Sequence, residues 1–236
     1  MAKTTTVASL GVALSELGQR VLLVDLDPQA CLTFSLGYDP EDLEASLHHV
    51  LLGAMKARDV LVSCDDGPDL LPATIELATA EVSLAAESEP EQVVRTALRP
   101  LAAAYDWIVV DCPPTLGLLT VNGLSAASDV LIPLQCETLA HRGVGQLLDT
   151  IHDVKRLTNP GLRVLGVLPT LYDGRTVHAR AVLETISDSY DLAVLAPPIP
   201  KSIRFAEAPA VGRSVLSTST RSAGANAYRQ LATTLL

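Results

Sequence analysis

Cysteines are few in this sequence, and their spacing argues against several kinds of cysteine-based site. The 236 residues hold four of them, Cys31, Cys64, Cys112 and Cys136, with no Cys-x-x-Cys pair and no histidine at ligand spacing. This pattern argues against a disulfide framework and a zinc site and indicates reduced thiols in the cytosol. No apolar run reaches the roughly 18 residues of a membrane span, and the first residues show no export signal.

Basic residues are also scarce. The chain has 17 Lys and Arg against 27 Asp and Glu, a net charge of −10 that argues against nucleic acid for the molecule as a whole. The two signs are unevenly distributed, however. Residues 1–150 hold 7 basic and 21 acidic residues, whereas residues 151–236 hold 10 and 6. The last third is therefore a basic region on an acidic body, either a binding surface or a solvated face.

The most informative stretch is Val-Leu-Leu-Val-Asp-Leu-Asp-Pro-Gln at residues 21–29. Its apolar run predicts a strand over residues 20–25 that is buried on both faces of a mostly parallel sheet. Asp25 and Asp27 end this run, and carboxylates in that place point into the crevice where open α/β sheets bind ligands. An aspartate after a strand can also be a turn or cap residue, and this alternative stays open for Asp25 taken alone.

The chain opens with a helical pattern. Apolar or small residues recur at helical spacing over residues 4–17, and Gly18 is expected to end the helix. Lys3, Thr4 and Thr5 match the last part of a P-loop, in which the lysine reaches the β- and γ-phosphates and the first hydroxyl binds Mg²⁺. Free N–H groups at the helix start would receive phosphate oxygens. Alone, this tripeptide is a weak signal, because most such tripeptides are ordinary surface.

A second apolar strand supports a nucleotide site. Residues 107–111 read Trp-Ile-Val-Val-Asp, so the strand ends in Asp111. An aspartate in this place holds Mg²⁺ or its water opposite a P-loop hydroxyl. Two prolines then restrict the loop, and the next helix is expected over residues 118–127.

The rest of the chain alternates between predicted strands and predicted helices. Strands are expected at residues 69–71, 130–134, 162–170 and 192–195, and helices at 43–52, 75–86, 142–157, 177–190 and 223–236. This alternation predicts an α/β fold, a doubly wound, mostly parallel sheet with helices on both faces. The length fits a single domain that spans residues 1–236.

Six motifs together resemble the ParA/Soj family of deviant Walker A partitioning ATPases, which are relatives of MinD. In chain order they are KTTT at 3–6, VLLVDLDPQ at 21–29, DCPPTLG at 111–117, IPLQCE at 132–137, YDGRT at 172–176 and IPKSIRFAEAP at 199–209. Each motif alone is common, whereas their order along nearly the whole chain is specific. The resemblance implies a P-loop NTPase that binds ATP and Mg²⁺.

The resemblance also implies roles for individual residues. Lys3 would be the phosphate lysine, Thr4 a Mg²⁺ ligand and Thr5 a phosphate contact. Asp27 would position the attacking water and belong to the metal site, and Asp25 would support the metal's second shell of contacts. Asp111 would be the Walker B carboxylate at the metal. Pro198 and Pro200 would complete the nucleotide contacts.

Partners follow from the same resemblance. Family members hydrolyse ATP slowly, dimerise around it, bind DNA without sequence preference as dimers, and are stimulated by a ParB-like protein. The DNA-binding residues expected here are Arg175, Arg180, Lys201, Arg204 and Arg213. No aromatic side chains interleave them, so the expected target is the phosphate backbone of double-stranded DNA in the cytoplasm, at the nucleoid.

The beginning of the sequence departs from the family pattern. Family members open with a strand and a loop of the form Lys-Gly-Gly-Val-Gly-Lys-Thr-Thr, and here Met1 and Ala2 stand at the Val and last Gly positions. We therefore expect a first strand to be missing beside Asp111, together with most of the glycine nest that cradles phosphates. Either the start of the reading frame was assigned too far downstream, or the chain is a truncated family member that serves as a non-catalytic interaction module.

Two further functions compete with this prediction. A MinD-like membrane ATPase would need an amphipathic terminal helix with several basic residues, and residues 223–236 offer only Arg229. No membrane partner is therefore expected. A dehydrogenase with a Rossmann ribose contact would explain a strand ending in aspartate. It would leave Asp27-Pro28 and Asp111-Cys112-Pro113-Pro114 unexplained.

Overall fold

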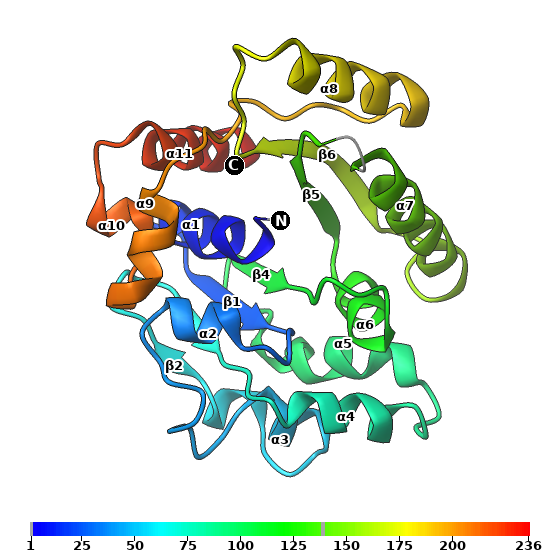
Figure 1. Cartoon of the computed structure of the whole chain (residues 1–236). Helices are drawn as coiled ribbons and strands as arrows, with labels where there is room; N and C mark the ends of the chain where they lie inside the picture. The colour runs from blue at the N-terminus through cyan, green and yellow to red at the C-terminus, as the bar shows by residue number, and fades with distance from the viewer. Residues whose placement is uncertain (1, 138–139) are drawn as a thin grey trace.

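The computed structural model describes residues 2–137 and 140–236. Its strands are β1 (Val21–Asp25), β2 (Val62–Ser63), β3 (Asp69–Leu71), β4 (Trp107–Asp111), β5 (Asp129–Gln135) and β6 (Arg163–Thr170). The longer helices are α1 (Lys3–Glu16), α4 (Leu77–Leu84), α5 (Val93–Leu98), α6 (Leu118–Ala126), α7 (Ala140–Leu157), α8 (Val177–Tyr190) and α11 (Ala223–Leu235). Short helices α2 (Cys31–Ser35), α3 (Leu47–Leu51), α9 (Arg204–Glu207) and α10 (Val215–Thr218) join them (Figure 1).

Strand β1 is the centre of the larger sheet, whose order is β2-β3-β1-β4. It pairs in parallel with β3 on one side and with β4 on the other, and its five residues are all buried. Leu23 faces the core under α1 and α11, whereas Leu22 and Val24 face the core under α3, α4 and α5. The apolar run at residues 21–24 is therefore explained by helices on both faces, and the predicted fold class is confirmed.

Helix α1 packs closely on β1 because of a glycine. A Cβ at Gly11 would lie 2.5 Å from Leu23 Cδ2, so only hydrogen fits between helix and strand. The helix ends as predicted at Gly18, which has a φ of +81° and donates its N–H to the Ser15 carbonyl. Leu14 and Val12 of this helix are almost fully buried against the sheet.

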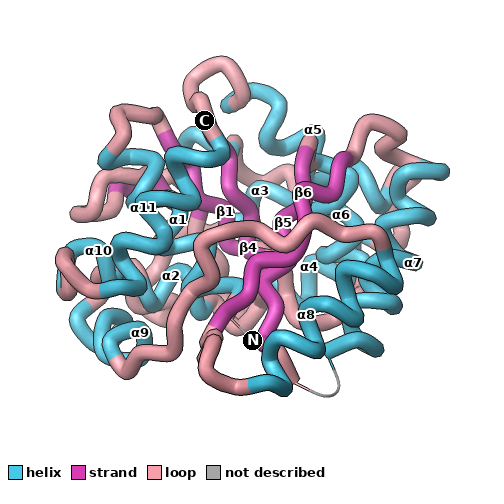
Figure 2. Tube along the Cα trace, turned by 90° about the horizontal axis from the view of Figure 1, so that it is seen from above, coloured by secondary structure: helices cyan, strands magenta, loops and turns pink. Residues whose placement is uncertain are grey.

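Strands β5 and β6 pair in parallel as a separate two-stranded sheet. Helices α7 and α8 pack on one face, and Leu131 and Leu168 on the other face join the core that α1 and α11 cover. Figure 2 shows β1, β4, β5 and β6 in the middle of the molecule with helices around them. Within the described residues, no strand pairs with the second edge of β4 or with the β5 edge that β6 leaves free. The sequence predicted a missing strand beside Asp111.

Most predicted elements are confirmed to within a few residues, one predicted strand is wrong, and some short elements were not predicted. Residues 192–195 form no strand, because only Val194 makes a bridge with Val167. The antiparallel edge strand β2 and helix α5 were not predicted. Among the described residues, no helix combines the length and apolarity needed to cross a membrane.

Candidate functional site

Three aspartates lie at the carboxyl ends of β1 and β4, where the sequence predicted a ligand crevice. Asp25 and Asp111 are register partners on neighbouring strands, and Asp27 follows β1 by two residues. Their exposed fractions are 0, 1 and 9%, so all three are buried. Buried carboxylates need hydrogen bonds or a cation, and the three differ in what they have.

Asp25 is fully committed to hydrogen bonds within the protein. Its Oδ2 accepts the N–H and the hydroxyl of Thr33 (2.9 and 2.7 Å), and its Oδ1 accepts the N–H of Asp27 (3.2 Å). Burial raises the pKa of Asp25 to about 6 in spite of these contacts, which favour its charged form. Asp25 therefore holds the loop between β1 and α2 in place.

Asp27 is more available. One oxygen accepts the N–H of Gln29 (2.9 Å), an Asx turn that fixes the loop after β1. No other hydrogen bond to this carboxylate is formed within the described chain. A carboxylate held by one oxygen, with the other free, can accept a proton from a water molecule or orient it.

Asp111 is the outlier, because neither of its buried carboxylate oxygens has a hydrogen-bond partner in the described residues. Burial raises its pKa to about 7, and the charge of Asp25 adds to this. Thr4 and Lys3 lie close enough to favour the charged form. The Thr4 hydroxyl does not reach hydrogen-bond geometry. An orphaned buried carboxylate of this kind fits a bound cation.

Lys3 reaches this site from the first turn of α1. Its Nζ donates to the backbone carbonyl oxygen of Pro113 (2.5 Å), in the loop that follows Asp111. Burial lowers the pKa of Lys3, while Cys112, Asp111 and Asp27 oppose that shift. The structure thus brings together the residues that sequence motifs placed about 110 positions apart.

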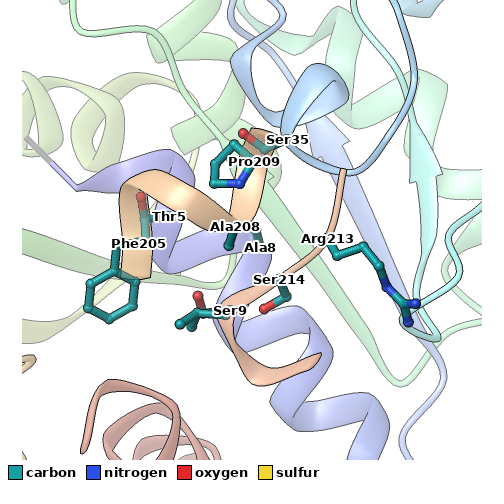
Figure 3. Close-up of a pocket in the computed structure, with 10 residues that line it drawn as sticks. Thr5, Ala8, Ser9, Ser35, Phe205, Ala208, Pro209, Arg213 and Ser214 are labelled. Atoms are coloured by element: carbon teal, nitrogen blue, oxygen red, sulfur yellow. The ribbon is translucent and has the colours of Figure 1, made fainter. Parts of the chain in front are cut away.

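Thr5 lies on another side of α1, toward α9 and the short helix at Ala208–Val211. There it lines a cavity of about 20 Å³, room for about one water, together with Ser9, Ser35, Phe205 and Pro209 (Figure 3). Pro209 is the last residue of the motif at 199–209. Thr4 near Asp111 and Thr5 near Pro209 are consecutive residues, so they point about 100° apart from the first turn of one helix.

Pro198 and Pro200 lie beside the end of β6. Pro198 is exposed, and Pro200 forms a bridge with Tyr172. Ile199 between them donates its N–H to Pro169 (2.8 Å) and packs in the same core as α1. The segment thus pairs with the end of β6 while the Ile199 side chain enters the core that α1 covers, and within the described chain no hydrogen bond joins either proline to residues 3–5.

The residues predicted to bind DNA are all exposed, and they lie on several different elements. Arg175 is paired with Asp173, and Lys201 lies near the same carboxylate. Arg204 at the start of α9 pairs with Glu207, and Arg180 lies on α8. The Arg213 guanidinium pairs with Asp66, whose side chain is only 2% exposed. This ion pair therefore also anchors the chain before α10.

Two contributors to this site were missed by sequence reasoning. Thr33 is fully buried, donates to Asp25, and accepts the N–H of Ala73 (3.0 Å). Glu81 on α4 accepts the N–H of Leu119 in the first turn of α6 (3.3 Å). Neither belongs to a motif, and only the tertiary contacts identify them.

The donor set decides which metal fits. Among the described residues, no three His, Cys, Asp or Glu side chains lie together as a self-sufficient metal site. Mg²⁺ needs no such cage, because it is usually held by one or two carboxylates, waters and the phosphates of its substrate. Asp111 with the nearby Thr4 hydroxyl fits that requirement.

Comparison with known proteins agrees with this geometry. The AAA domain family matches residues 1–164. The chain is 39% identical to the sporulation initiation inhibitor protein Soj of Bacillus subtilis, across 98% of this chain and 91% of that protein. It is 43% identical to the chromosome-partitioning ATPase Soj of Thermus thermophilus, across 98% and 88%. The chain belongs to the ParA/Soj family.

A solved structure shares the fold at still higher identity. A Mycobacterium smegmatis protein described as cobyrinic acid a,c-diamide synthase is 55% identical, with a TM-score of 0.89 over 99% of this chain and 88% of that one. It was crystallised with ADP and magnesium, and also with an ATP analogue and magnesium. These ligands agree with the predicted cofactors, ATP and Mg²⁺. The present chain, a ParA/Soj family member, thus has the fold of a P-loop ATPase.

Proposed function

We propose that this ParA/Soj family member is a partitioning ATPase whose whole length, residues 1–236, acts as one domain. The observation that carries the proposal is the buried Asp111 carboxylate beside Lys3 and Thr4, which has no hydrogen-bond partner among the residues that the structure describes. A buried carboxylate in this state costs folding free energy unless a ligand uses it. Mg²⁺ with ATP is the ligand that family membership and the donor chemistry both favour.

Each site residue then has a task. Asp111 and Thr4 would hold Mg²⁺, which supplies charge neutralisation at the phosphates, and Lys3 and Thr5 would hold phosphate oxygens. Asp27 would orient the attacking water near the metal with its free oxygen, while Asp25 keeps the Asp27 loop in place through Thr33. Pro198 and Pro200 would contact the base.

The proposed output is ATP-dependent dimerisation and binding to double-stranded DNA without sequence preference. Arg175, Arg180, Lys201 and Arg204 are exposed and free to exchange weak surface ion pairs for phosphates. Arg213 would also contribute to DNA binding while its guanidinium stays paired with Asp66. A ParB-like protein would stimulate hydrolysis, and the protein would work in the cytoplasm at the nucleoid.

The structural neighbour's description raises a second candidate, ATP-dependent formation of an amide on a corrin acid. If glutamine supplied the nitrogen, a reactive thiolate would be the expected nucleophile. All four cysteines have raised pKa values, to about 12 for Cys64 and Cys112, because burial disfavours the thiolate. The raised thiol pKa values therefore argue against the amide-forming enzyme and favour the partitioning ATPase.

The two functions separate in one experiment. ATP turnover is measured with Mg²⁺ alone, with double-stranded DNA and a ParB-like protein from the same genome, and with cobyrinic acid and glutamine. We expect turnover to rise with DNA and partner, and Asp111→Asn to weaken Mg·ATP binding by at least about tenfold. A rise only with cobyrinic acid and glutamine, accompanied by amide product, would show the second function instead.

A further inference from the structure

The loop between Asp111 and α6 is tied to the protein at both ends. At its beginning, the buried Pro113 carbonyl accepts the Lys3 ammonium (2.5 Å). At its end, the Thr120 hydroxyl of α6 donates back to the Thr115 carbonyl (2.6 Å). Any change in the position of Lys3 is therefore passed to this loop and to the start of α6.

Helix α6 cannot cap its own N-terminus. Its first turn contains no acidic residue, and Gly117 at the N-cap has no side chain that could accept an N–H. The first four N–H groups of a helix lack partners within the helix and favour a negative charge nearby. Glu81 supplies this charge from α4, since its half-buried carboxylate accepts the Leu119 N–H (3.3 Å).

Gly117 leaves room for this carboxylate. Its backbone is extended, with a φ of −80° and a ψ of −170°, which any residue can adopt. A Cβ at this position would instead lie 2.7 Å from Glu81 Oε1, too close for any real contact. The glycine leaves the space that lets the Glu81 carboxylate rest against the start of α6.

We propose that Glu81 is a positioning residue for the loop of residues 112–117, which it holds in register with Lys3 and Asp111. The inference rests on the proposed ATPase function and deepens it. Without nucleotide, Lys3 has a neutral carbonyl as its partner, and a phosphate carrying negative charge would compete for it. When Lys3 leaves Pro113, the Glu81 contact keeps the other end of the loop in place, so Asp111 stays aligned.

The test uses the 236-residue chain and two changes to the same contact. Glu81→Ala removes the carboxylate, and Gly117→Ala forces it away. Either change should lower the kcat of ATP turnover about tenfold while KM stays within about twofold, because orientation rather than binding is lost. Since both act on one contact, the double variant should be no slower than the single ones. Glu81→Gln, which keeps an acceptor oxygen in place, should recover most of the rate.

Hydrogen exchange without nucleotide gives an independent readout. Amides of residues 115–121 should exchange at least about fivefold faster in Glu81→Ala, whereas α1 and α11 keep their wild-type rates. Glu87→Ala is the matched control, because this carboxylate is exposed just beyond α4 and forms no side-chain hydrogen bond or ion pair within the described residues. If the wild-type chain hydrolysed no ATP, the proposed function would fail, yet the exchange result would still decide the role of Glu81. Unchanged exchange and kcat in Glu81→Ala, or losses that add in the double variant, would overturn the proposal.

Discussion

Asp25 and Asp111 are register partners at the ends of β1 and β4, and yet their carboxylates have opposite surroundings. Asp25 accepts three hydrogen bonds, whereas Asp111 accepts none within the described chain. Their pKa values are raised to about 6 and about 7, mainly because both are buried. The first carboxylate organises the loop, and the second is left for a ligand.

The raised pKa values predict how stability depends on pH in protein freed of metal by EDTA. An unfolded aspartate has a pKa of about 3.9, so between about pH 4 and pH 7 the folded chain binds protons that the unfolded chain has lost. The free energy of unfolding should therefore fall as pH rises through this window and level off above it. Asp111→Asn needs no proton and should be more stable than wild type at pH 8 by roughly 1–3 kcal/mol. Thermal melts from pH 5 to 8 check this, and equal pH dependence of both proteins would contradict the prediction.

Thr33→Val should destabilise the fold. The substitution keeps the shape of the side chain, removes a donor from Asp25, and leaves the Ala73 N–H without a partner. Two buried groups lose hydrogen bonds, so we expect a loss of roughly 2–4 kcal/mol and a Tm lower by about 5–15 °C. Thr185→Val on the exposed face of α8 is the control and should change stability by less than about 0.5 kcal/mol. Equal melts for the two variants would show that Thr33 plays no such part.

Arg204→Glu should weaken DNA binding and its dependence on salt. If a dimer neutralised six phosphates, log K would fall against log salt with a slope of about −5, and loss of one contact per protomer would flatten it by about 2. Arg156→Glu is a matched control, because Arg156 also forms an exposed i,i+3 pair, with Asp153. Fluorescence anisotropy with two unrelated duplexes across a salt series measures both variants. An unaltered slope in Arg204→Glu would move the DNA surface elsewhere.

The open edges of β4 and β5 suggest a gain-of-function test. A version of the chain in which a strand and the family's glycine-rich loop precede Lys3 should bind ATP at least about tenfold more tightly, because glycine N–H groups would surround the β-phosphate. It should also melt higher, since both strand edges would gain hydrogen-bond partners. Calorimetric titration and melts compare it with the 236-residue chain, and matching values would contradict this expectation.

The parts of the fold that sequence could predict are those with a local pattern. Helix α8 begins and ends at the predicted residues. Strand β1 is buried on both faces, and β4 is apolar up to Asp111 although its apolar residues are only partly buried, so both strands read as apolar runs. Strand β2 has two residues, and the segment around Val194 makes one bridge, so pairing there depends on distant partners that no local pattern records.

The candidate site divides in the same way. Lys3, Thr4 and Asp111 were predicted because their residue types and their places at element ends carry the chemistry. Thr33 contacts Asp25, and Glu81 contacts the start of α6, each from a separate element, and a buried threonine or a helix-surface glutamate has no distinctive spacing.

ATP turnover by Asp27→Ala tests the proposed function most directly, because the proposed role of this carboxylate is to orient water and not to bind nucleotide. Asp39→Ala is its matched control, because Asp39 is exposed and makes the same turn contact, with the Glu41 N–H (3.0 Å). We predict that Asp27→Ala binds Mg·ATP within about threefold of wild type while turnover falls by at least about a hundredfold, and that Asp39→Ala matches wild type in both. Equal turnover in wild type and Asp27→Ala would contradict the account.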